Sequence, residues 1–183
     1  MPYRELPKSD AGKEDALQII YDLAAAKPVS ELVFSQANYN KVKEFYPKYK
    51  KEITERGTAL SAQSEATTVR AAAEGKCKTY VSHFYQVFNL GVDRDEHKAS
   101  ERAFYKLDVS QESVPLLNNA DDIRRNAENI INGEVERVNA GGAPMSNPSK
   151  DQVEAAYNDF AAKLKDHFLF LVVHECADLK QIY

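Results

Sequence analysis

The stretch that decides the fold is VSHFYQVFNL, residues 81–90. Its large apolar side chains recur every three or four residues, which places them on one face of an α-helix. These side chains are Val81, Phe84, Tyr85 and Phe88. A face of this kind must be buried, so the stretch predicts a principal core helix. Gly91 is the expected residue at which this helix ends, because glycine is favoured just past a helix C-terminus.

Working outward, five further stretches show helical spacing of apolar residues. They span residues 11–26, 38 to about 71, 95–105, 119 to about 140, and 149 onward. Between them, residues 106–117 (KLDVSQESVPLL) are interpreted as an extended loop. The positions expected to face inward in the two middle stretches are Ala99, Ala103 and Phe104, followed by Ile123, Ala127, Ile130, Ile131, Val135 and Val138.

Residues 38–71 carry a heptad-like seam. Its members, spaced three, four or seven residues apart, are Val42, Tyr46, Tyr49, Ile53 and Leu60. A mean repeat near 3.5 residues is typical of a left-handed helix pair. Pro47 lies inside the seam and is expected to kink the helix or restart it, because proline removes one backbone hydrogen bond.

The last two helices have recognisable starting signals. Asn118 or Asn119 precedes two aspartates, which favour the positive end of a helix. Ser149 lies three residues before Gln152, as in a capping box. Between these helices, residues 141–149 (GGAPMSNPS) are interpreted as a structural turn. An anion-binding loop is the less favoured alternative, because Lys150 is the only adjacent basic residue.

Composition agrees with a helical domain. Of 183 residues, 43% are hydrophobic and 28% charged, and glycine and proline number seven each. Together with the helical spacing, this predicts an all-α bundle of five to six helices, with a long helix hairpin and one extended loop. We expect a single domain over residues 1–183, in which residues 1–10 form a flexible N-terminal segment.

Charge and terminal sequence limit the possible partners. The net charge of −4 argues against nucleic acid or an anionic membrane as a partner. The lysine-rich residues 41–51 are interspersed with glutamate and are interpreted as a solvated helix face. The longest apolar run, residues 168–173, is far shorter than the roughly 20 residues that cross a bilayer. With a polar N-terminus, these features predict a cytoplasmic protein.

No catalytic or cofactor motif is found in the sequence. The chain lacks nucleophile-elbow, phosphate-loop and dinucleotide-binding patterns, and no Glu-x-x-His pair suggests a di-iron site. We therefore expect no enzyme activity, no cofactor and no metal. The alternative is a small-ligand or metal-binding bundle, which would require convergence of the side chains of His83, His167, His174 and Cys176.

Several strings resemble a group of all-helical proteins of unassigned activity encoded in Bacteroidota genomes. They are SHFYQVFNLGV (82–92), ASERAFYKLDV (99–109), SVPLL (113–117) and GEVERVNAGGAPMSNPS (133–149). The resemblance covers roughly residues 60–160 and does not continue past about Lys163. It implies a helical fold and a non-housekeeping role, and it implies no catalytic residue or cofactor.

The favoured function is a structural or assembly protein. Such a subunit would form a homo-oligomer or dock on another protein subunit through apolar helix faces, where tyrosine is a favoured contact residue. The chain contains ten tyrosines and no tryptophan. The candidate interface residues are Tyr46, Tyr49, Ile53, Phe168, Phe170, Leu171 and Val172.

Overall fold

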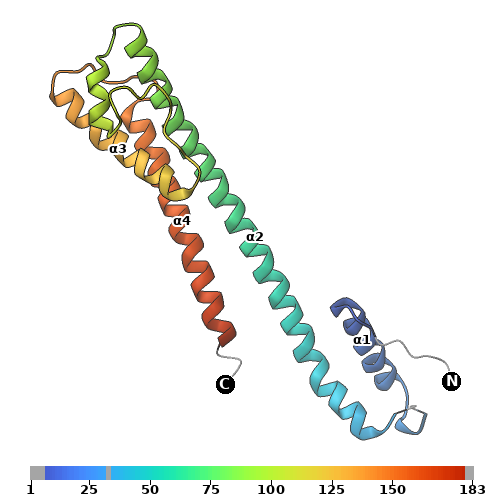
Figure 1. The fold of residues 1–183 in the computed structure, drawn as a ribbon. Helices are drawn as coiled ribbons and strands as arrows, with labels where there is room; N and C mark the ends of the chain where they lie inside the picture. Colours follow the sequence, from blue (N-terminus) through green and yellow to red (C-terminus); the bar gives the residue numbers. More distant parts are fainter. Residues whose placement is uncertain (1–6, 32–33, 180–183) are drawn as a thin grey trace. The chain divides into compact units, whose positions relative to one another are not determined.

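The computed structural model describes residues 7–31 and 34–179, with side chains except at Val29 and after Val172. Over this part of the chain the regular structure is helical, and the expected all-α class is confirmed (Figure 1). The elements are α1 (Asp10–Ala26), the 3₁₀ helix η1 (Val29–Glu31), α2 (Gln36–Asp93), the 3₁₀ helix η2 (Ala99–Tyr105), α3 (Ala120–Asn139) and α4 (Lys150–Leu179).

The chain divides into two compact units, residues 1–62 and 63–183, and α2 contributes to both. A single domain, a bundle arrangement and a helix hairpin therefore stay predictions. Of the expected flexible segment 1–10, residues 1–6 lie outside the described residues. Ser9 instead caps α1, since its Oγ accepts a hydrogen bond from the Gly12 amide at 3.1 Å.

The first unit consists of α1 and the beginning of α2. Tyr46 is buried there, with its ring centroid 5.3 Å from that of Tyr21. The Tyr46 hydroxyl donates a hydrogen bond to Gln18. At the other end of α1, Asp10 forms an ion pair of 3.3 Å with Arg56 of α2. The small helix α1 is thus held on α2 by one aromatic contact and two polar contacts.

Helix α2 runs without interruption through Pro47. The expected restart at Pro47 is therefore wrong, and a bend there stays a prediction. The expected end at Gly91 is also wrong, because α2 continues to Asp93. Glycine at position 91 allows a close contact with His97, because a Cβ at this position would lie 2.4 Å from Cδ2 of His97. The imidazole of His97 lies next to Gly91 and stacks on Phe88 at 5.2 Å.

The core of the second unit is centred on residues 81–90, as predicted. Val81, Phe84, Tyr85 and Phe88 are completely buried. They pack with apolar side chains of η2, α3, the α3–α4 connection and the first half of α4, namely Tyr105, Ile123, Ala127, Ile130, Met145, Val153, Ala156 and Phe160. The ring of Tyr105 contacts both phenylalanines edge-on, at 5.4 and 5.0 Å.

The inward face of η2 differs from the prediction. The buried residues are Arg102 and Tyr105, whereas Ala103 is exposed and Ala99 and Phe104 are half-buried. The reason is the helix type, because side chains at positions i and i+3 of a 3₁₀ helix lie above one another. An α-helical period therefore selected the wrong face.

Helix α3 begins as predicted but continues its buried face differently. Asn119 is the N-cap, with its Oδ1 accepting a hydrogen bond from the Asp122 amide at 2.8 Å. The predicted burial of Val135 and Val138 is wrong, since both are exposed. The positions that continue the Ile123–Ala127–Ile130 face are occupied by charged residues, which the next section describes.

Helix α4 begins with the predicted capping box. The Ser149 amide donates to Gln152 at 2.9 Å, and the Gln152 amide donates to Ser149 Oγ at 3.3 Å. Contact with the core extends as far as Leu164, which is partly buried. Figure 1 shows that α4 continues well beyond its first half, which packs against the core. Within the described residues, no helix combines the length and apolar character needed to cross a membrane.

Candidate functional site

Glu134 and Arg137 of α3 form a buried ion pair in the second unit. Their exposed fractions are 2% and 1%. Arg137 donates to Glu134 through Nε at 2.9 Å and through Nη2 at 3.0 Å, a two-pronged geometry that favours strong pairing. Two residues of η2 complete this group: Tyr105 donates to Glu134 at 2.5 Å, and Glu101 accepts from Arg137 at 3.1 Å. We call these four residues the Glu134 cluster.

The cluster also holds the connection between α3 and α4. The Met145 amide donates to Glu134 Oε1 at 2.6 Å, and Arg137 Nη2 donates to the Ala143 carbonyl at 2.5 Å. The first of these bonds satisfies the buried amide of Met145, which would otherwise lack a partner. Both bonds support the interpretation of residues 141–149 as a structural turn.

The Glu134 carboxylate is stabilised in its charged form. Burial raises the pKa of Glu134, but hydrogen bonds from Arg137, the Met145 amide and Tyr105 lower it further than burial raises it. Burial and the neighbouring carboxylate both raise the pKa of Tyr105. Both carboxylate oxygens of Glu134 accept two hydrogen bonds each. The cluster therefore joins η2, α3 and the α3–α4 connection.

Glu134 and Arg137 were missed from the sequence because charged residues are normally exposed. A signal was nevertheless present. Positions 134 and 137 extend the spacing of the buried positions 123, 127 and 130 by alternating steps of four and three. An oppositely charged pair that continues a core face is a pattern typical of a buried ion pair.

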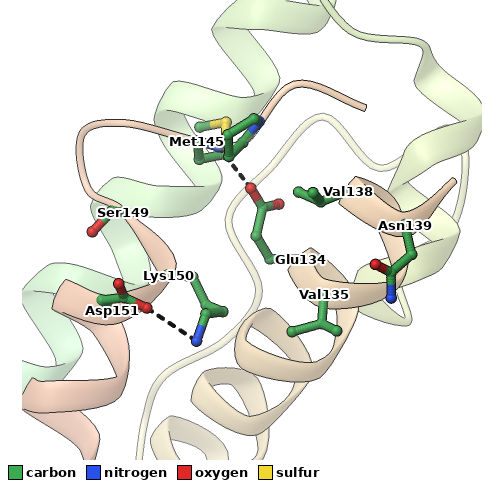
Figure 2. A pocket seen from close by; sticks show the side chains of 9 residues that line it. Glu134, Val135, Val138, Asn139, Met145, Ser149, Lys150 and Asp151 are labelled. Atoms are coloured by element: carbon green, nitrogen blue, oxygen red, sulfur yellow. Dashed lines mark hydrogen bonds and ion pairs between the residues drawn. The ribbon is translucent and has the colours of Figure 1, made fainter. Parts of the chain in front are cut away.

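A cavity of about 310 Å³ lies beside the cluster, between the end of α3 and the start of α4 (Figure 2). We call it the α3–α4 pocket. Its lining residues are Glu134, Val135, Val138, Asn139, Pro144, Met145, Ser149, Lys150 and Asp151. Lys150 forms ion pairs with Asp151 at 3.0 Å and Glu154 at 2.8 Å. The pocket thus combines apolar walls with a charged edge.

The second half of α4 presents an apolar surface to solvent. Phe168, Leu169 and Val172 are exposed by 58%, 54% and 56%. Their spacing places them on one face of the helix. We call them the α4 face. Phe168 and Val172 are among the predicted interface residues, and Leu169 is not. The remaining predicted interface residues of this helix, Phe170 and Leu171, are half-buried.

The predicted seam of α2 is partly covered within the chain. Tyr46 is buried against α1, and Tyr49 and Ile53 are half-buried. Leu60 of the same seam is exposed. Tyr46, Tyr49 and Ile53 belong to the first unit, and the predicted interface residues of α4 belong to the second. The role of both groups in assembly stays a prediction.

The histidines do not form a metal centre within the described residues, where no group of three potential ligands is found. His83 is exposed and His167 is half-buried. The side chains of His174 and Cys176 lie outside the described residues, so the predicted convergence with them is not addressed. Cys77 is a buried free thiol, and burial raises its pKa to about 11.

Comparisons with protein-family models, with curated proteins and with solved structures find no match to this chain.

Proposed function

We propose that this protein is a non-enzymatic structural subunit that assembles into a homo-oligomer through the α4 face. The observation that carries the proposal is the exposure of Phe168, Leu169 and Val172 on a single side of one helix. Contiguous exposed apolar residues are a common feature of protein interaction sites. Scattered exposed apolar residues, by contrast, are normal on any protein surface.

The energetic scale supports a specific contact. Fully burying a large apolar side chain contributes roughly 1.5–3 kcal/mol. Since each member of the α4 face is only a little more than half exposed, covering the exposed part would contribute on the order of 1 kcal/mol per side chain. Loss of two members from each copy should therefore weaken association by at least tenfold, because about 1.4 kcal/mol corresponds to a factor of ten.

The second unit offers little that would favour catalysis. The side chains of the Glu134 cluster form hydrogen bonds with one another and with the main chain of the α3–α4 connection. In this proposal the protein acts in the cytoplasm, where Cys77 would remain a thiol. The net charge of −4 favours a protein partner over nucleic acid.

The test is light scattering after size-exclusion chromatography, from about one to about one hundred micromolar chain. The wild-type chain should assemble as its concentration rises. The double variant Phe168→Ser/Leu169→Ser should remain monomeric up to a concentration at least tenfold higher than the wild type does. Leu116→Ser is the matched control, because Leu116 is an exposed leucine elsewhere in the same unit. A wild-type monomer at the highest concentration, or equal loss of assembly in the control, would contradict the proposal.

A further inference from the structure

We propose that the α4 face of one copy binds in the α3–α4 pocket of a second copy, so that the chains join head to tail. The inference rests on the proposed self-association and adds the identity of the receiving surface. It predicts that each copy contributes two different surfaces to assembly, one at each end of α4.

A single chain cannot make this contact with itself. Asp151 at the pocket and Phe168 on the α4 face belong to the same uninterrupted helix. Because an α-helix rises about 1.5 Å per residue, the two positions lie about 25 Å apart along its axis. The helix would have to break for the face to reach its own pocket. The occupant must therefore come from another molecule.

The pocket suits a large apolar side chain. Its volume of about 310 Å³ is near the lower end of the size range of binding pockets. Val135 and Val138 on its α3 side are both exposed, and Pro144 and Met145 come from the connection. An inserted Phe168 would contact these apolar walls, and the exposed valines would be covered at the same time.

The charges at the two surfaces are complementary. Lys150 at the pocket is shared between Asp151, which also lines the pocket, and Glu154, which lies about one helical turn farther along α4, so the start of α4 carries a negative excess. On its N-terminal side the α4 face is preceded by Lys163, Lys165 and Asp166, which leaves a positive excess on that side, whereas Glu175, Asp178 and Lys180 follow the face. Lys165 is exposed and lies one helical turn before the α4 face. Complementary charge of this kind orients an encounter and selects the partner.

A contact between two different surfaces has a geometric consequence. After two copies have joined, the pair still offers a free pocket on one copy and a free α4 face on the other. Such contacts generate a closed ring if the rotation between copies closes, and a filament if it does not. Pairing of two α4 faces with each other would stop at a dimer.

The test uses two variants, each of which removes one surface. Phe168→Asp alters the α4 face, and Val135→Asp alters the pocket at an exposed position. Each variant alone should be monomeric by light scattering at concentrations where the wild type exceeds a dimer. An equimolar mixture should form a dimer that does not grow, because the mixture retains one intact face and one intact pocket per pair.

Different failures separate the two proposals. If Val135→Asp assembles like the wild type while Phe168→Asp does not, the head-to-tail contact is overturned and self-association through α4 stands. If both variants are monomeric and their mixture forms no dimer, the head-to-tail contact is also overturned. If the wild-type chain is monomeric, both proposals fail.

A charge exchange provides a second test with residues whose replacement is compatible with folding. Asp151 and Lys165 are both exposed. In the proposed contact, Lys165 of one copy pairs with Asp151 of the next. Lys165→Asp and Asp151→Lys should therefore each weaken assembly by roughly two- to fivefold, as expected for loss of a surface ion pair. The double variant should recover assembly, because the pair forms again with reversed signs. Additive weakening in the double variant would overturn the proposed contact.

Discussion

Replacing Glu134 by glutamine should destabilise the second unit strongly. Glu134 is 2% exposed, and its two oxygens accept hydrogen bonds from Arg137, Tyr105 and the Met145 amide. Breaking a buried ion pair by removing one charge costs about 3–5 kcal/mol. Glutamine keeps the shape and one acceptor, and Glu101 remains 3.1 Å from Arg137. The expected loss in free energy of unfolding is therefore at the lower end, about 3 kcal/mol.

The dependence of this loss on pH is also determined by the structure. The pKa of Glu134 is lower in the folded protein than in the unfolded chain, where it is about 4.3. Its contribution is therefore fully present above pH ~4.3 and disappears as the pH falls through the lower folded-state pKa. The stability difference between wild type and Glu134→Gln should stay constant near neutral pH and shrink at acid pH.

The assay is urea unfolding of both proteins, followed by circular dichroism between about pH 3 and pH 8. Glu136→Gln is the matched control, because Glu136 is an exposed glutamate on the same helix. It should change stability by less than about 0.5 kcal/mol. A loss below about 1 kcal/mol for Glu134→Gln at pH 7, or a loss that persists unchanged at pH 3, would refute the reasoning.

Two further predictions concern helix packing and capping. Gly133→Ala should destabilise by about 1–3 kcal/mol, because the new Cβ would lie 2.4 Å from the Phe104 carbonyl oxygen, a backbone atom that cannot move easily. Gly75→Ala, where a Cβ meets nothing within 4 Å, should instead stabilise by about 0.5–1 kcal/mol, and thermal unfolding of both variants checks the opposite signs. Asn119→Ala should lose about 1 kcal/mol by removing the acceptor for the Asp122 amide, whereas Asn119→Asp should retain most of it in urea titrations; equal losses would contradict the capping role.

The parts of the fold that could be predicted depend on local sequence. The apolar face of residues 81–90 is buried as expected, because four large side chains on one helical face have few alternatives to burial. The caps at Asn119 and Ser149 were equally predictable from the sequence, since each cap involves residues only three positions apart. Helix ends were less predictable. A helix end was expected at Gly91 only because the residue is glycine, whereas the glycine in fact leaves space for the ring of His97.

The Glu134 cluster could not be derived in the same way. The charge of Glu134 suggested exposure, and two members of the cluster, Glu101 and Tyr105, lie in a different helix about thirty residues earlier. The exposed α4 face could be predicted only in part. The sequence indicated an apolar segment from residue 168 onward, but which side of it remained uncovered depends on where the core ends, near Leu164.

The way in which the α3–α4 connection is held has a consequence for how this protein can vary. Arg137 binds the carbonyl of Ala143 and Glu134 binds the amide of Met145, so both anchors on the connection are main-chain atoms. Every amino acid except proline supplies an amide, and every residue supplies a carbonyl. The exposed side chain at position 143 can therefore be exchanged with little effect, whereas the two α3 side chains cannot. In descendants or designed variants of this chain, we expect a Glu-x-x-Arg pair at the end of α3 to persist after the letters of the connection have diverged.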